Sequence, residues 1–169
     1  MKKSTSIILS AITAGTAGAI GGAINVYRRE RKQLNQERKT TEKDNEILKA
    51  YSHWIRRKQK GESLVDYFHR AGYNKIAIYG MHYLGESLVT ELEDSDIEIV
   101  CAIDKYAELR YTDLPIYTPD ENIPEVDAVI VTAFFYFEEI KNALLSKMDC
   151  PIISIEDIIY ENEMDELDV

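Results

Sequence analysis

A short turn carries the residues whose types and spacing suggest chemistry: Gly80-Met-His-Tyr-Leu-Gly85, between an apolar run and an amphipathic stretch. In the dinucleotide-binding fingerprint G-x-G-x-x-G, the first glycine makes the turn, the second admits the pyrophosphate and the third packs helix on strand. Gly80 and Gly85 supply the first and third glycines, and His82 takes the middle place. A histidine there would crowd a pyrophosphate in its usual position, but it could donate a hydrogen bond to a phosphate placed differently.

Two more polar residues follow apolar runs. Asp104 comes directly after the run Ile97–Ile103, where the fingerprint has the acid that binds the ribose hydroxyls. Thr132 ends a later run and would face the same crevice. The competing interpretation is structural, with the glycines serving turn and packing and Asp104 capping a loop. The predicted binding residues for a nucleotide-type ligand are Gly80, His82, Gly85, Asp104 and Thr132.

The sequence offers no recognisable catalytic set. Tyr136 and Lys141 are one residue too far apart for the Tyr-x-x-x-Lys pair of short-chain sugar oxidoreductases. Cys101 and Cys150 lie in or beside apolar runs and have no CxxC partner, so we expect buried, inert thiols. The three histidines are scattered, and no metal site is predicted.

Apolar runs alternate with amphipathic stretches over residues 62–160. This alternation predicts an α/β domain with a small Rossmann-like parallel sheet of about five strands. The strands are expected at Lys75–Tyr79, Ile97–Ile103, Pro115–Tyr117, Asp127–Thr132 and Pro151–Ile155. Helices are expected from Ser63 to Ala71, from the turn to Glu93, at Glu138–Lys147 and at Glu156–Tyr160, before an acidic tail over residues 161–169.

Residues 1–26 contain a stretch, Ile7–Ile24, without a charged residue. Its 18 residues would form about 27 Å of helix, slightly less than a hydrocarbon core of about 30 Å. We expect a single-pass membrane anchor. A cleaved signal peptide and a soluble helix packed on a partner are the alternatives. The basic residues that follow favour a cytoplasmic Rossmann-like domain.

Residues 27–61 are rich in helix formers and predict a long basic helix. Residues at a seven-residue spacing are Tyr27, Leu34, Thr41, Leu48 and Ile55. The matching second positions of the heptad are acidic in the first half of the helix, so a solvated helix is expected there rather than a full coiled coil. Nearer its end, an apolar face is expected to dock on the domain or on a second copy, and comprises Ile47, Leu48, Tyr51, Trp54 and Ile55.

Charge divides the chain sharply. Residues 1–61 hold 14 Lys+Arg against 5 Asp+Glu, whereas the remainder holds 6 against 25, within a net charge of −10. A basic segment beside an apolar run favours an anionic membrane surface as partner. Nucleic acid is disfavoured, because the acidic half would repel a phosphate backbone.

The segment Lys75–Tyr160 resembles the small nucleotide-binding, CoA-binding-like Rossmann domain of membrane-bound polysaccharide-biosynthesis proteins, the sugar-nucleotide dehydratase/epimerase kind. The resemblance is carried by Ile76–Gly80, Gly85, the strand before Asp104, Leu114–Tyr117 and Asp127–Thr132. It implies a nucleotide or nucleotide-sugar ligand and a cell-surface glycan pathway. The matched segment lacks the catalytic epimerase domain, which favours an accessory role.

Three functions are therefore compared. The first is a membrane-tethered, non-catalytic module that binds a nucleotide-type ligand and assists a glycan-biosynthesis enzyme. The second is a minimal NAD(P)-dependent sugar-nucleotide oxidoreductase or epimerase, completed by a partner or by a second copy in a homo-oligomer. The third is a ligand-free scaffold that holds partners through its anchor, long helix and acidic surface.

Overall fold

A computed structural model describes the backbone of residues 2–105 and 114–161, with side chains from residue 27 onward. The chain divides into two compact units, Met1–Ile47 and Leu48–Val169. One continuous helix, α1 (Lys2–Gln59), forms the first unit and contributes its last residues to the second. The helix ends before Gly61, whose φ of 81° lies in the left-handed region that glycine adopts readily.

No helix in the part of the chain that the structure describes is long and apolar enough to cross a membrane. The anchor expected at Ile7–Ile24 lies in residues whose side chains fall outside that part, so it stays a prediction. The acidic tail lies outside it too, apart from Glu161.

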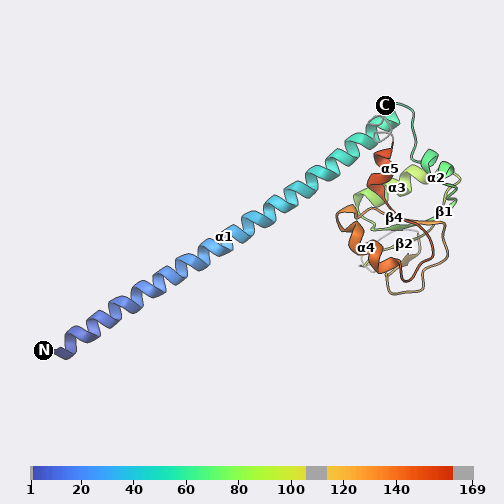
Figure 1. Ribbon diagram of the computed structural model, residues 1–169. Coiled ribbons are helices and arrows are strands. Elements are labelled where there is room, and N and C mark those ends of the chain that lie inside the picture. Colours follow the sequence, from blue (N-terminus) through green and yellow to red (C-terminus); the bar gives the residue numbers. More distant parts are fainter. Residues whose placement is uncertain (1, 106–113, 162–169) are drawn as a thin grey trace. The chain divides into compact units, whose positions relative to one another are not determined.

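The second unit is an α/β fold with a five-stranded parallel sheet, as the alternating pattern predicted (Figure 1). The strands are ordered β3-β2-β1-β4-β5, so the order reverses between β1 and β4. Strands are β1 (Lys75–Tyr79), β2 (Glu98–Ile103), β3 (Ile116–Tyr117), β4 (Ala128–Val131) and β5 (Ile152–Ser154). Helices are α2 (Val65–Ala71), α3 (Tyr83–Leu92), α4 (Phe137–Leu144) and α5 (Ile155–Ile159), with a 3-10 turn η2 (Phe134–Tyr136) before α4.

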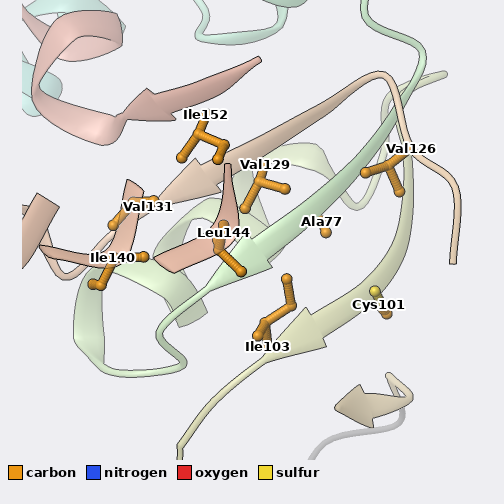
Figure 2. Packing of buried hydrophobic residues seen from close by; sticks show 9 residues of the cluster. All are labelled: Ala77, Cys101, Ile103, Val126, Val129, Val131, Ile140, Leu144 and Ile152. Carbon is orange, nitrogen blue, oxygen red and sulfur yellow. The ribbon is translucent and has the colours of Figure 1, made fainter. Parts of the chain in front are cut away.

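The sheet is covered on both faces, with α4 on one side and α3 and α5 on the other (Figure 1). Successive side chains of a strand point to opposite faces of the sheet. Ala77 therefore faces α4, while its neighbours Ile76 and Ile78 face away from it. Figure 2 shows Ile140 and Leu144 of α4 packed against side chains of β1, β2, β4 and β5. All four residues of β4 are buried, as expected for a central parallel strand.

Helix α2 begins two residues later than predicted, at Val65, and ends at Ala71 as predicted. The Ser63 hydroxyl accepts a hydrogen bond from the Val65 amide at 3.2 Å, and Asp66 accepts one from the Ser63 amide at 3.3 Å. Both bonds lie in the turn that precedes the helix, and the N-cap residue itself, Leu64, makes no side-chain capping hydrogen bond. Gly72 ends the helix with a φ of 74° and donates its backbone N–H to the helix's last turn.

The last turns of α1 pack on the α/β fold through part of the predicted face, since Trp54 is buried and the hydroxyls of Tyr51 and Ser87 lie 3.0 Å apart. Ala50 and Trp54 are buried, whereas Leu48 and Ile55 are 65% and 54% exposed. Arg57, one turn beyond Trp54, is also buried, at 7% exposure. The tertiary contact therefore uses the aromatic members of the predicted face, adds a small residue and an arginine, and leaves two of its aliphatic members exposed.

Candidate functional site

Gly80 and Gly85 are required by the close approach of α3 to the end of β1. Gly80 has a φ of 94°, and a β-carbon there would lie 3.0 Å from Oγ1 of Thr132. A β-carbon at Gly85 would lie only 2.2 Å from the carbonyl oxygen of Gly80. The backbone of α3 therefore touches the turn itself, a contact that any side chain at Gly85 would prevent.

Thr132 ties β4 to β1 where the strand order reverses. Its hydroxyl donates to the carbonyl oxygen of Tyr79 at 3.1 Å and also to that of Gly80. Its backbone N–H donates to the Tyr79 carbonyl at 3.0 Å. Thr132 is buried, so its side chain serves contacts between the ends of β1 and β4. In open α/β sheets, ligands bind just outside the carboxyl ends of the strands at such a reversal.

Asp104 is turned into the protein. It is 5% exposed, and its Oδ2 accepts a hydrogen bond from the Met81 backbone N–H at 3.1 Å. The carboxylate therefore fastens the end of β2 to the turn that follows β1. Burial, followed by the negative charge of Asp104, raises the pKa of the Tyr79 phenol. Whether Asp104 also reaches a ribose, as the fingerprint position suggests, stays a prediction.

His82 is the N-cap residue of α3 and differs from the other four predicted residues in being exposed. Its backbone is extended, with φ −92° and ψ −169°, and its carbonyl accepts from the Glu86 N–H at 2.9 Å. The first N–H groups of a helix have no intrahelical acceptor and attract anions. The structure thus brings Gly80, His82, Gly85, Asp104 and Thr132 to one turn, with only the imidazole at the surface.

Sequence reasoning did not find two surface hollows of this unit. One, of about 380 Å³, lies between the end of α1 and α3; it is lined by Tyr51, Trp54, Ile55, Lys58, Tyr83, Glu86, Ser87, Thr90 and Glu91. The other, of about 450 Å³, lies beside η2, α4 and α5; it is lined by Phe134–Glu139, Ser154, Glu156 and Asp157. Each hollow is lined by segments that are distant in the chain, so no local sequence motif could have predicted it.

The aromatic run Phe134–Phe137 combines a core role with a surface role. Phe134 is buried, and its ring centroid lies 4.2 Å from that of Phe135. Tyr136 is 52% exposed beside the second hollow. The carboxylates there belong to the first turns of α4 and α5, where acidic residues stabilise the helix macrodipole.

Within residues 27–105 and 114–161, no group of three or more His, Cys, Asp or Glu side chains is arranged to hold a metal ion. Cys101 is buried, as predicted, and burial raises the pKa of its thiol to about 11. A thiol is unreactive at neutral pH when so little thiolate is present. Cys150 is partly buried, and desolvation also raises the pKa of its thiol.

The sheet order, the strand–turn–helix at Gly80–Gly85 and the helices on both faces define a Rossmann-like α/β domain. Residues 72–155, just under half of the chain, match the family model described as C2185-like, N-terminal. The match runs from the end of α2 to the start of α5, so it covers the whole sheet. No curated protein and no solved structure matches the chain.

Proposed function

We propose that residues 62–160 are a non-catalytic binding module for a nucleotide-type ligand that docks at the N-terminus of α3. The observation that carries the proposal is the reversal of strand order between β1 and β4, with the Gly80–Gly85 turn at that point. The connections after two such strands lead to opposite faces of the sheet, and the resulting crevice is the usual ligand site of open α/β folds.

Phosphate is the group that this turn suits best. The first N–H groups of α3 begin at His82, and an anion gains both hydrogen bonds and the helix macrodipole there. The exposed His82 imidazole adds a side-chain donor beside them. The buried residues of the turn hold its backbone in shape and need not touch the ligand themselves.

The same contacts argue against catalysis by these residues. Asp104 accepts from the Met81 amide, and the Thr132 hydroxyl donates to backbone carbonyls of β1 and the turn. A general base or nucleophile must reach the reacting group of a substrate, and both side chains are buried and turned inward.

The resemblance of Lys75–Tyr160 to the Rossmann domain of polysaccharide-biosynthesis proteins extends the proposal to an accessory role in surface glycan assembly. The uncharged stretch Ile7–Ile24 and the basic residues after it support a membrane tether with this domain on the cytoplasmic side. A nucleotide-sugar is then the ligand class to test first, with NAD(P) second.

A thermal-shift series on the full chain tests the proposal, with nucleotides, nucleotide-sugars, NAD(P) and CoA compounds as ligands. A ligand at a hundredfold excess over its Kd adds about 2.7 kcal/mol of stability, which gives a clear rise in Tm. We expect His82→Asp to abolish this rise through repulsion of the phosphate, and His82→Asn to retain most of it. If no compound raises Tm, the binding proposal is wrong and the scaffold alternative gains. Turnover of NAD(P) with a nucleotide-sugar would favour the oxidoreductase.

A further inference from the structure

Helix α1 displays large apolar side chains to solvent at a regular interval. Tyr27 and Leu34 are 62% and 57% exposed, and Leu48 and Ile55 are 65% and 54% exposed. Neighbours in this series lie seven or fourteen residues apart, and exposed Thr41 occupies the intervening position. Because seven residues make almost two full turns of an α-helix, these side chains recur on one face. We name Tyr27, Leu34, Thr41, Leu48 and Ile55 the heptad stripe.

Within the second unit, the described part of the α/β fold leaves the stripe residues Leu48 and Ile55 exposed. Its contacts with the end of α1 include the buried Ala50 and Trp54 and a hydrogen bond between the hydroxyls of Tyr51 and Ser87. Ala50 follows a stripe position by two residues and Trp54 precedes one by a single residue. At about 100° per residue, Ala50 lies on the far side of the helix from the stripe, and Trp54 lies about a quarter of a turn from it. Leu48 and Ile55 therefore stay available to a further partner while the helix end is docked.

Opposite charges flank the stripe in the first unit. Glu30 and Glu37 each follow a stripe residue by three positions, and Arg31 and Arg38 each follow one by four. Residues three and four positions away lie about 50° to either side of the stripe. All four are exposed. One edge of the stripe is acidic and the other is basic, and the Arg31 guanidinium lies 5.9 Å from the ring centroid of Tyr27.

This charge order selects one arrangement of two identical helices. When two helices run parallel about a two-fold axis along their length, the left edge of one faces the right edge of the other. Glu30 and Glu37 of one copy would then face Arg31 and Arg38 of the second copy. In the antiparallel arrangement, acidic edge meets acidic edge and basic meets basic, which is unfavourable.

In the second unit, a surface hollow lies beside the last residue of the stripe. Ile55 borders the hollow of about 380 Å³ between α1 and α3. Tyr83 of α3 lies on the same hollow and is 74% exposed. A second helix lying along the stripe would cover Ile55 and Tyr83 together, and would remove from water the exposed apolar side chains of this region.

We propose that a second copy of this chain binds along the heptad stripe, so that two α1 helices associate in parallel and in register. With one apolar position per heptad, the association is weaker than that of a coiled coil with two. The acidic edge argues for a second copy rather than an anionic lipid surface as the occupant. The inference does not depend on ligand binding at the Gly80–Gly85 turn.

Sedimentation velocity on the full chain over a concentration series tests the proposal. We expect a monomer–dimer equilibrium, and a rise of about tenfold or more in the dimer dissociation constant for Leu34→Asp with Leu48→Asp. Leu145→Asp is the matched control, because Leu145 is 55% exposed but lies at the end of α4. A wild-type monomer at every concentration overturns the proposal. So does a dimer that the double variant leaves intact, or one that Leu145→Asp weakens equally.

The parallel, in-register arrangement of the two α1 helices is tested by disulfide cross-linking in a Cys150→Ser background. Leu34→Cys should form a disulfide between copies, whereas Gln36→Cys, exposed on the opposite side of the helix, should stay reduced. Equal cross-linking at both positions would mean random encounter and would overturn the proposal. Binding to anionic vesicles that depends on Leu34 and Leu48, without any dimer, would also overturn it.

Charge exchange gives a second, independent test. A chain with Arg31→Glu and Arg38→Glu has two acidic edges, and a chain with Glu30→Arg and Glu37→Arg has two basic edges. Each should dimerise more weakly than the wild type, and their mixture should form a heterodimer. If each variant alone dimerises as well as the mixture does, the parallel pairing is wrong.

Discussion

Arg57 and Ile158 are joined by a hydrogen bond across 101 positions of the chain, from the guanidinium Nη1 to the main-chain carbonyl at 2.5 Å. Nη1 also donates to the Ile159 carbonyl at 3.4 Å. Glu62 lies 3.3 Å from Nε, an ion pair that does not meet hydrogen-bond geometry. The last carbonyls of a helix lack intrahelical partners and carry partial negative charge. Arg57 therefore caps α5 and fastens the end of α1 to it.

Replacement of Arg57 by alanine should lower the free energy of unfolding by about 2–3 kcal/mol, because buried carbonyls lose a charged donor. Arg56→Ala is the matched control. Arg56 is exposed and donates to the Ser52 hydroxyl at 2.9 Å, so its loss should cost less than about 0.5 kcal/mol. Urea unfolding of the full chain measures both. Equal losses would contradict the capping role of Arg57.

Gly85→Ala should be among the most destabilising single-atom additions in the chain. The new β-carbon would lie 2.2 Å from the Gly80 carbonyl oxygen, so α3 must move away from β1. We expect a loss of about 3 kcal/mol or more, the upper range for overpacking. Gly72→Ala is the comparison, since nothing lies within 4 Å there. Its left-handed φ alone should cost about 1–2 kcal/mol. Thermal unfolding that ranks Gly72→Ala as the worse variant would contradict the close contact.

Asp127 should make the free energy of unfolding depend on pH in the acidic range. Its carboxylate accepts from the backbone N–H groups of Asn74 and Lys75, both at 2.8 Å. The hydrogen bond from Lys75, then that from Asn74, lowers the pKa of Asp127 below its ordinary 3.8. A carboxyl group whose pKa is lower when folded stabilises the fold above its unfolded pKa. That contribution is lost as pH falls through the lower folded value.

The test compares Asp127→Asn with the wild type between neutral pH and pH 3. The variant should be less stable at neutral pH, and the difference should shrink as the wild-type carboxylate is protonated. Asp94→Asn, at an exposed position, should show no such convergence. A difference that is constant with pH would mean that the Asp127 charge does not contribute.

Cys101 should react with thiol reagents only when the protein opens. Its thiol is buried and its pKa is raised to about 11 by desolvation, so thiolate is scarce at pH 8. Cys150 is partly buried and should react faster. Alkylation kinetics followed by mass spectrometry, with and without urea, distinguish the two. Rapid labelling of Cys101 in the native protein would contradict the packing shown in Figure 2.

Several elements were predictable because their signals are local. The run Asp127–Thr132 was predicted as a strand and contains β4 (Ala128–Val131), and the predicted helix end at Ala71 is the observed one. Boundaries shifted slightly: Ile155 was assigned to the last strand, but it begins α5, because Ser154 caps that helix by accepting from the Glu156 amide at 3.3 Å. The order of the strands was not readable, since pairing joins residues distant in sequence.

The sequence predicted where the Gly80–Gly85 turn lies in the chain, but not how the side chains around it are oriented. The spacing of Gly80 and Gly85 identified the turn, because backbone freedom and close helix contact are demands on single residues. The inward direction of Asp104 and its bond to the Met81 amide depend on the neighbouring strand. The sequence suggested a ligand contact for this carboxylate, which stays a prediction, and did not reveal the internal hydrogen bond that the structure shows.

By itself, the sequence of this protein determined the α/β class, the turn at Gly80–Gly85 and a long basic helix with a seven-residue apolar interval. Periodicity, glycine placement and charge are properties of short segments, so they can be recognised without knowledge of the fold. Only the tertiary structure decided that Arg57 caps α5 and that Leu48 and Ile55 remain exposed. Those outcomes depend on which surfaces meet, and two segments about a hundred residues apart are brought together only by the packing of the whole domain.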